Sequence, residues 1–261
     1  MLLTAQLKPR QRPTWSPGKP VIKTDTFRSP SGPETADPRW AIARIRQSLP
    51  SQVERTNLTD LHKLLDERGL GRHKQSLSKA YEVARKAHAG VTREEGTPYI
   101  HHPARVCATL IKTGGITDID VLNAALLHDV VEDSPLTVSD IKHQFGGRTA
   151  GFVELLTKPS SSAFSSKEEC NRFQAQRLAA APREVRMVKV ADRLDNVGDL
   201  HLLPPNGKMS RYLKDTRENY LPLAQDTSDA LHAALQLRVC QLERLDLLQQ
   251  IQSAEHLDLI A

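Results

Sequence analysis

The sequence predicts an all-α fold. From residue 40 onwards, apolar side chains recur at the three- and four-residue spacing of helices, and no stretch shows the alternation typical of a half-buried strand. The 261 residues, 39% of them hydrophobic, suffice for one core of substantial size. No apolar run reaches the roughly 18 to 20 residues that span a bilayer, so we expect a cytoplasmic protein without a membrane partner.

Positive charge is concentrated ahead of the predicted fold. The formal net charge is +5, and five cations precede the first acidic residue, Asp25. These cations are Lys8, Arg10, Arg12, Lys19 and Lys23. Because they equal the whole excess, nucleic-acid binding by the fold itself is poorly supported. The three cysteines are scattered, as expected for reduced cytosolic thiols.

The N-terminal segments predict a tail followed by accessory helices. Residues 1–38 contain seven prolines and few large apolar side chains, so they cannot bury enough surface to offset the entropy of ordering. We therefore expect a disordered, Pro-rich basic tail. Residues 39–72 carry two short apolar stripes at helical spacing, the second ending at Gly69, and predict accessory helices or a partner-binding hairpin.

A helix predicted over residues 75–89 leads into a loop rich in glycine and proline. Pro103 follows this loop and is favoured in the first turn of the next helix. His101 and His102 therefore lie at a helix start, and because adjacent side chains point in different directions we expect only one to bind a metal. Two loop residues are expected to line the mouth of a pocket: Arg93 and Tyr99.

The stretch from Val121 to Asp133 organises the rest of the chain. Its first half is apolar on nearly every face, as in a helix buried on all sides, yet it ends in four polar residues. A carboxylate out of water must find a cation or take up a proton, so a metal ion is the expected partner. Helical spacing separates a ligand pair, His128 and Asp129, from an acid–base pair, Glu132 and Asp133.

A second acid lies beside the core in the helix predicted over residues 184–200. Asp192 directly follows an apolar stretch in which only Lys189 is polar, and Asn196 shares its face one turn later. Pairing Asp192 with the first polar cluster would explain both sets of buried charge.

The other segments predict further helices and one polar loop. Short helices are expected over residues 137–145 and 150–156, separated by Gly146 and Gly147, and a longer one over 167–180. The loop at residues 160–166 could close over a site as a lid. Two helical stretches follow, 208–224 and 229–251; the latter, within the C-terminal segment 227–261, could pack on the body or on a second subunit.

Three separated motifs now occur in order: Thr92-Arg-x-x-Gly-x-Pro-Tyr-Ile-x-His-Pro103, His128-Asp-x-x-Glu-Asp133 and Val188-Lys-Val-Ala-Asp-Arg-Leu-x-Asn196. Together they closely resemble the HD-type hydrolase domain of the RelA/SpoT alarmone enzymes, which we assign to residues 73–226. The chain looks like a stand-alone small alarmone hydrolase, and we expect no synthetase domain.

The resemblance implies a helical HD-domain bundle with one divalent ion, usually manganese. It implies hydrolysis of the 3′-diphosphate of ppGpp or pppGpp to GDP or GTP plus pyrophosphate, which ends the stringent response. The implied metal ligands are His102, His128, Asp129 and Asp192. The implied roles of Glu132 and Asp133 are to position and activate water, and those of Arg93 and Asn196 to contact the nucleotide. Two imidazoles and two carboxylates suit a first-row transition metal better than magnesium.

Cations are also needed to neutralise the substrate's phosphates. The candidates are Arg93, Lys158, Lys189 and Arg193. Lys189 and Arg193 fit a solvated helix face equally well. Two departures remove positive charge where the family usually has a basic residue: Glu94 and Gly198. Both bear on which base is preferred.

Two other functions remain open on the sequence. A phosphatase of another nucleotide, such as NADPH or the adenosine alarmones (p)ppApp, would use the same metal chemistry. A catalytically inactive nucleotide sensor or scaffold belongs to a different class, and the intact set of metal and acid residues argues against it.

Overall fold

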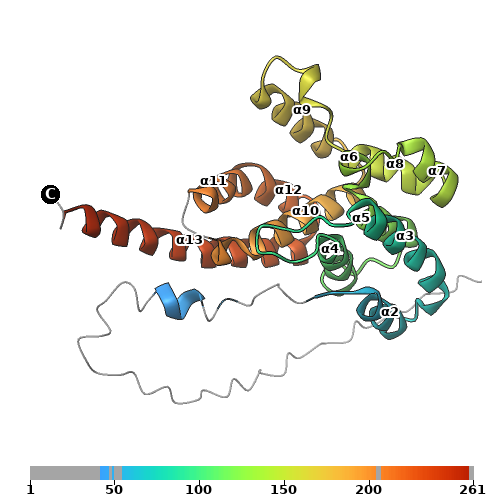
Figure 1. Ribbon diagram of the computed structural model, residues 1–261, viewed down its shortest axis with the longest axis horizontal. Helices are drawn as coiled ribbons and strands as arrows, with labels where there is room; N and C mark the ends of the chain where they lie inside the picture. The colour runs from blue at the N-terminus through green and yellow to red at the C-terminus, as the bar shows by residue number, and fades with distance from the viewer. Residues whose placement is uncertain (1–41, 47–48, 50–54, 204–206, 259–261) are drawn as a thin grey trace, which may run out of the picture.

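The computed structural model describes residues 42–46, 49, 55–203 and 207–258 (Figure 1). The predicted tail, residues 1–38, lies outside the described residues. Residues 42–46 are helical. The helices of the first half are α2 (Leu58–Glu67), α3 (Lys74–Ala87), α4 (His101–Lys112), α5 (Ile119–Leu127), α6 (Val130–Asp133), α7 (Val138–Phe145) and α8 (Gly147–Leu156). Those of the second half are α9 (Lys167–Ala179), α10 (Arg183–Gly198), α11 (Lys208–Asp215), α12 (Leu221–Gln225) and α13 (Asp229–Asp258).

The predicted all-α class is confirmed over the part of the chain that the structure describes. Its single β-type contact there is an isolated antiparallel bridge between Thr92 and Pro98. Short 3-10 turns occupy Gly71–His73, Ser161–Ala163 and Leu200–Leu202, and a π-helical turn, Thr216–Tyr220, joins α11 to α12.

Helix α5 lies at the centre of the bundle, packed against α3, α4, α8 and α10 (Figure 1). All residues from Val121 to Leu127 are buried. The helix has no polar face because every side is covered by a neighbour, which matches its nearly uniform apolar sequence. Its C-terminal end therefore delivers the following residues, His128 and Asp129, into the interior.

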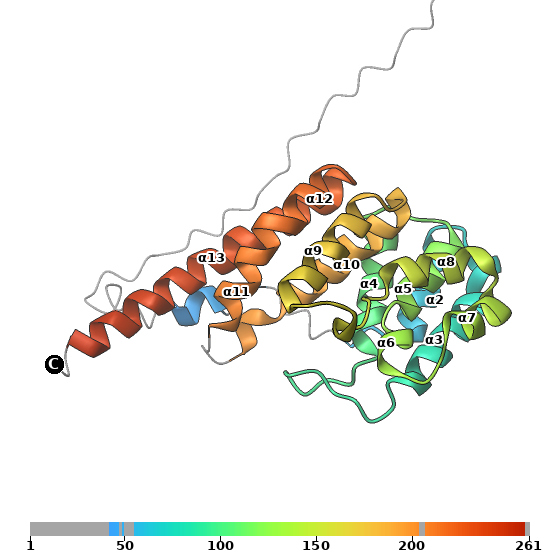
Figure 2. The same cartoon turned by 90° about the horizontal axis from the view of Figure 1, so that it is seen from above.

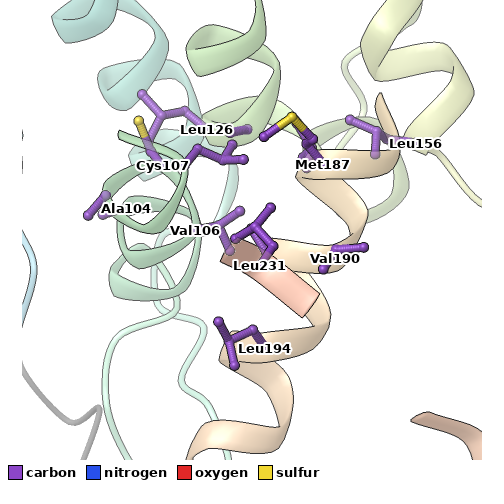
Figure 3. Packing of buried hydrophobic residues seen from close by; sticks show 14 of the residues in the cluster. Ala104, Val106, Cys107, Leu126, Leu156, Met187, Val190, Leu194 and Leu231 are labelled. Atoms are coloured by element: carbon purple, nitrogen blue, oxygen red, sulfur yellow. The ribbon is translucent and has the colours of Figure 1, made fainter. Parts of the chain in front are cut away.

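Helix α10 is the second core element. It packs against α4 and α13, and its apolar side chains interdigitate with those of α4, α8 and α13 (Figure 3). The labelled side chains include Val106 from α4, Leu156 from α8, Val190 and Leu194 from α10 and Leu231 from α13. This packing fixes the face of α10 that carries Asp192.

Helix α13 packs along α10, α11 and α12 and then projects past them towards the C-terminus (Figure 2). Its inner face buries an apolar stripe that includes Leu235, Leu242 and Leu245. Its outer face leaves Leu237 and Leu247 exposed. None of the described helices is long and apolar enough to cross a membrane.

One predicted boundary is wrong. The sequence placed both Gly146 and Gly147 between two helices, but α8 begins at Gly147. Gly146 alone makes the break, because its φ of +89° is a backbone conformation that side-chain-bearing residues rarely adopt. Gly147 has ordinary backbone angles and can start a helix.

The segment predicted as a polar loop, residues 160–166, contains the turn Ser161–Ala163. Phe164 at its end packs on Phe173 of α9, with ring centroids 5.3 Å apart. Closure of this segment over a site stays a prediction.

The central position of α5 predicts a stability effect. Leu126 has no exposed surface, so Leu126→Ala should lower the free energy of unfolding by about 2–5 kcal/mol through lost burial and a residual cavity. Leu237 is 61% exposed, so Leu237→Ala should change the free energy of unfolding by less than about 0.5 kcal/mol. Chemical denaturation of both variants checks the difference; equal losses would contradict the described core.

Candidate metal centre and active site

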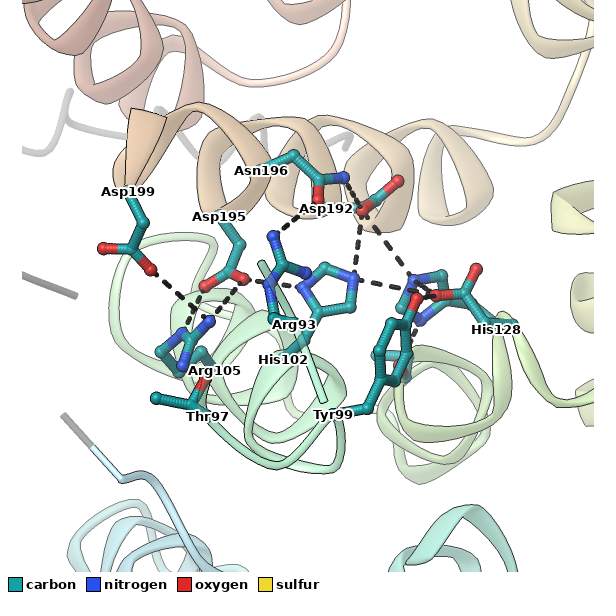
Figure 4. A network of polar contacts seen from close by, with 12 residues as sticks. Arg93, Thr97, Tyr99, His102, Arg105, His128, Asp192, Asp195, Asn196 and Asp199 are labelled. Atoms are coloured by element: carbon teal, nitrogen blue, oxygen red, sulfur yellow. Dashed lines mark hydrogen bonds and ion pairs between the residues drawn. The ribbon is translucent and has the colours of Figure 1, made fainter. Parts of the chain in front are cut away.

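Two imidazoles and two carboxylates converge where three elements meet. His102 comes from the first turn of α4, His128 and Asp129 from the α5–α6 junction, and Asp192 from the middle of α10 (Figure 4). Nε2 of His102 lies 3.3 Å from Asp192 Oδ1 and 3.7 Å from Asp129 Oδ2. Nε2 of His128 lies 3.0 Å from Asp129 Oδ2 and 3.8 Å from Asp192 Oδ1. Both imidazoles thus face both carboxylates.

These residues fit a divalent metal ion. The candidate ligand atoms of His102, His128 and Asp129 all lie within 4.8 Å of one another, and Asp192 reaches both imidazoles. His128 Nε2 is buried and makes no hydrogen bond within the described residues, although a carboxylate oxygen lies nearby. A buried nitrogen in that state is available to a metal ion, and nitrogen–oxygen donor sets of this kind bind first-row transition metals.

The local backbone explains how the histidines are aimed. Nδ1 of His128 faces the carbonyl oxygen of Ala125 at 2.9 Å, which turns Nε2 towards the cluster. His101, the neighbour of His102, instead contacts the backbone oxygen of Thr56 through Nδ1. The two adjacent histidines therefore point in different directions, as predicted, and only His102 enters the cluster.

Opposite charges hold the carboxylates ionised. Burial would raise the pKa of Asp192, but the ammonium group of Lys189, 2.7 Å away, and the two histidines hold that pKa well below its usual range. Burial would likewise lower the pKa of His128, yet the adjacent Asp129 carboxylate raises it to about 9. The cluster is therefore an assembly of paired charges at neutral pH.

The acid pair borders this cluster on α6. Glu132 Oε1 accepts a hydrogen bond from the backbone N–H of Lys158 at 2.6 Å, and Asp133 Oδ2 lies 3.6 Å from Nδ1 of His88. Burial raises the pKa of Glu132 and of Asp133. Both residues nevertheless remain exposed enough to exchange protons with solvent.

His88 is another polar residue next to the acid pair. It is buried and its ring lies 4.5 Å from that of Tyr99, which agrees with packing. Its closeness to the Asp133 carboxylate also makes it part of the site's polar surroundings.

A cleft of about 280 Å³ opens beside the cluster. Its lining includes Arg93, Tyr99, Asn196, Lys208 and Tyr212. Hydrogen bonds within the 91–99 loop hold Arg93 in place. The backbone N–H of Arg93 donates to the carbonyl oxygen of Thr97 at 2.8 Å. The predicted pocket residues Arg93 and Tyr99 thus lie together in one cleft.

Hydrogen bonds connect the cleft to the metal cluster. The Arg93 guanidinium donates to Asn196 Oδ1 at 3.1 Å, and Asn196 Nδ2 donates to Asp192 Oδ1 at 2.5 Å. The Tyr99 hydroxyl donates to Asp129 Oδ2 at 2.6 Å. Any molecule that contacts these side chains therefore lies next to the cluster.

The other basic residues predicted at the site have different places. Lys158 is exposed and lies outside the cleft lining; its backbone amide contacts Glu132. Lys189 points its ammonium at Asp192 instead of occupying a solvated face. Arg193 is buried against the ring of Tyr220, with its guanidinium carbon 3.9 Å from the ring centroid, and pairs with Asp215.

Sequence reasoning missed three buried polar residues behind the cluster. Asp195 contacts His102 and Arg105, and Asp199 lies close to Arg105. Two signals were available: a charged residue, Arg105, among the mostly apolar residues that follow Pro103, and an acid three residues after Asp192. Spacing could not show that they meet, because they come from different helices.

Residues 80–227 match the HD domain family, so the chain belongs to that family. Two curated relatives are similar over the same region. The Guanosine-3′,5′-bis(diphosphate) 3′-pyrophosphohydrolase of Aquifex aeolicus is 37% identical over 165 residues, 63% of this chain and 23% of the relative. The Bifunctional (p)ppGpp synthase/hydrolase SpoT of Escherichia coli is 40% identical over 151 residues, 57% of this chain and 21% of the relative. The chain spans about a fifth of each relative's length.

A solved structure is also similar. It comes from work described as "A metazoan ortholog of SpoT hydrolyzes ppGpp and plays a role in starvation responses". The TM-score is 0.57 at 29% identity, and the match covers 63% of this chain and 94% of that one. The resemblance to the RelA/SpoT hydrolase domain is thereby confirmed.

The donor set predicts that divalent ions stabilise the fold. An ion that binds only the native state at one hundred times its Kd should add about 2.7 kcal/mol of stability and raise Tm. In Asp192→Asn the increase should be lost, whereas the exposed acid Asp66, changed to Asn, should leave it intact. Differential scanning fluorimetry with added Mn²⁺ measures this; an Asp192→Asn protein stabilised like the wild type would contradict the predicted site.

Proposed function

We propose that this chain hydrolyses the 3′-diphosphate of the guanosine alarmones ppGpp and pppGpp, releasing pyrophosphate and GDP or GTP and so ending the stringent response. The observation that carries the proposal is the joining of three features at one place: the His–Asp cluster, the acid pair of α6 and the cleft containing Arg93. The names of the similar proteins supply the substrate class.

His102, His128, Asp129 and Asp192 are the proposed ligands of one manganese ion. When bound, such an ion lowers the pKa of water and polarises a phosphoryl oxygen. The imidazoles supply nitrogen donors once a metal ion has displaced their second proton, and the carboxylates supply negative charge. Manganese accepts both donor types, which favours it over magnesium.

Glu132 and Asp133 are the proposed proton carriers. In the reaction, the oxygen of water forms a bond to the phosphorus attached to the 3′ oxygen, and the bond from phosphorus to that 3′ oxygen breaks. Glu132 takes the proton from the attacking water, and Asp133 relays a proton to the leaving oxygen. The raised pKa of each carboxyl group suits this exchange near neutral pH.

The cleft is the proposed nucleotide site. Arg93 and Asn196 would bind the sugar–phosphate portion, with Tyr99 beside them. Lys158, from the other side of the acid pair, would attract the outgoing pyrophosphate. Lys208 pairs with Glu94 at the rim, which reduces the positive charge available to the substrate. Because the cleft has less positive charge than the family usually has, we retain a second substrate class as an alternative, namely NADPH or the adenosine alarmones (p)ppApp.

The wider assignments form part of the same proposal. Residues 73–226 are the catalytic unit, residues 39–72 an accessory segment and residues 227–261 a C-terminal helix. Three reduced cysteines agree with a cytoplasmic location. The exposed Leu237 and Leu247 of α13 offer a surface to a second subunit.

The decisive test is pyrophosphate release from ppGpp by the purified chain with Mn²⁺. We expect GDP and pyrophosphate in equal amounts, and no turnover by metal-free protein or by Asp192→Ala. Turnover of NADPH or ppApp but not ppGpp would replace the substrate assignment. A protein that binds metal but hydrolyses none of these nucleotides would favour the sensor or scaffold alternative.

Glu132→Gln tests the proton acceptor. We expect kcat to fall by about 10²- to 10⁴-fold because general base assistance is removed, with metal binding retained. Wild-type activity should be lost as the pH falls through the pKa of Glu132, which burial raises above the usual value of about 4.3. That acid limb should disappear in the variant.

The matched control for this variant is Glu154→Gln, on the exposed surface of α8. Its pH–rate profile should coincide with that of the wild type. Retention of full activity and of the acid limb in Glu132→Gln would rule out Glu132 as the base.

A further inference from the structure

A buried polar chain lies behind His102, on the side away from the metal cluster. Nδ1 of His102 is 2.6 Å from Asp195 Oδ2, and Arg105 donates to both oxygens of Asp195, at 2.7 and 3.0 Å (Figure 4). The exposed fractions are 1% for His102, 2% for Asp195 and 6% for Arg105. Water therefore cannot replace these contacts, and each side chain is held by its neighbour.

We propose that Asp195, fixed by Arg105, is a positioning residue that aims Nε2 of His102 at the metal ion. The inference rests on the proposed metal site and adds a residue that acts through a ligand without being one.

The contact with Asp195 selects one tautomer of the His102 imidazole. An ionised carboxylate only accepts hydrogen bonds, so the contact with Asp195 requires the hydrogen of the imidazole to be on Nδ1. In the neutral imidazole, the form that a metal ion binds, Nε2 then carries the lone pair, and it faces Asp192 Oδ1 and Asp129 Oδ2. The opposite tautomer would turn an N–H towards the ion and could not bind it.

Arg105 fixes the orientation of the Asp195 carboxylate. Its guanidinium is charged at all relevant pH values and donates one hydrogen bond to each carboxylate oxygen of Asp195, in a bidentate arrangement. A buried carboxylate without this partner would lose the two hydrogen bonds that fix its orientation. The residue pair therefore serves one function: to present an immobile negative charge to Nδ1 of His102.

The second histidine provides an internal comparison. His128 is oriented by the neutral backbone oxygen of Ala125, whereas His102 is oriented by a carboxylate. A carboxylate partner increases the basicity of the imidazole and so strengthens its bond to a metal ion. Losing Asp195 should weaken the metal site even though all four proposed ligands remain.

The obvious competing explanation is that Arg105 and Asp195 only stabilise the fold. Asp199 distinguishes the two explanations, because it lies 3.7 Å from the same guanidinium, directly after the end of α10, whereas Asp195 contacts both Arg105 and His102. A purely structural role predicts similar consequences for the two acids. A positioning role predicts that only Asp195 affects metal affinity.

The experiment compares Asp195→Asn with Asp199→Asn in the full chain. Isothermal titration with Mn²⁺ gives the Kd, and thermal unfolding without metal reports on the fold. We expect Asp195→Asn to raise the Kd by about 10- to 100-fold, and Asp199→Asn to change it by less than about two-fold. Activity is not needed for either readout.

A double variant covers the case in which Asp195→Asn leaves Arg105 unpaired and fails to fold. Asp195→Leu with Arg105→Met replaces the buried ion pair by apolar side chains of similar size, a change that folds often tolerate. We expect its metal-free Tm to stay near the wild-type value while its Kd rises by the same factor as in the single variant.

The outcomes separate this inference from the proposed function. Wild-type protein that binds no Mn²⁺ would overturn both. Wild-type protein that binds Mn²⁺, with unchanged affinity in the Asp195 variants, would overturn the positioning role alone. Equal losses in the Asp195 and Asp199 variants would assign both acids to the fold.

Discussion

The structure depends on placing two carboxylates and two imidazoles together inside a helical core. Each of these groups would be costly to bury alone. Their close approach is possible because α5 and α10 are covered on their other sides by apolar neighbours, so that the polar end of α5 faces the side of α10 that carries Asp192. The same arrangement creates the region of concentrated negative charge that a divalent ion requires.

Residues of opposite charge surround this cluster on more than one side. Lys189 pairs with Asp192 on one side, and the pair of Arg105 and Asp195 stands behind His102 on another. Such pairs keep the carboxylates ionised, because each cation offsets part of the cost of burial. The metal site is consequently built into the packing of α4 and α10, and any change in how these helices pack would disturb the ligands.

The cleft has a different character from the cluster. Its basic residues are already engaged: Arg93 with Asn196 and Glu95, and Lys208 with Glu94. A phosphorylated substrate must compete with these partners, so binding and selectivity depend on which contacts it can replace. The presence of Glu94, noted in the sequence as a loss of positive charge, thus has a structural counterpart at the rim of the cleft.

The choice of His102 over His101, and the full set of four ligands, came from the resemblance to the RelA/SpoT hydrolase domain. The sequence by itself determined the helical class, the burial of Val121–Leu127, the expectation that only one of His101 and His102 binds a metal, and the pairing of Asp192 with the polar residues that follow α5. These follow from periodicity and from the cost of burying unpaired charge, which are local properties. Only the tertiary structure decided the partners of Lys189 and Arg193 and the contact of Asp195 with His102 and Arg105. Some of those contacts join different helices, and the others depend on which side of a helix is covered by neighbouring helices. The spacing of residues along the sequence gives no information about these features.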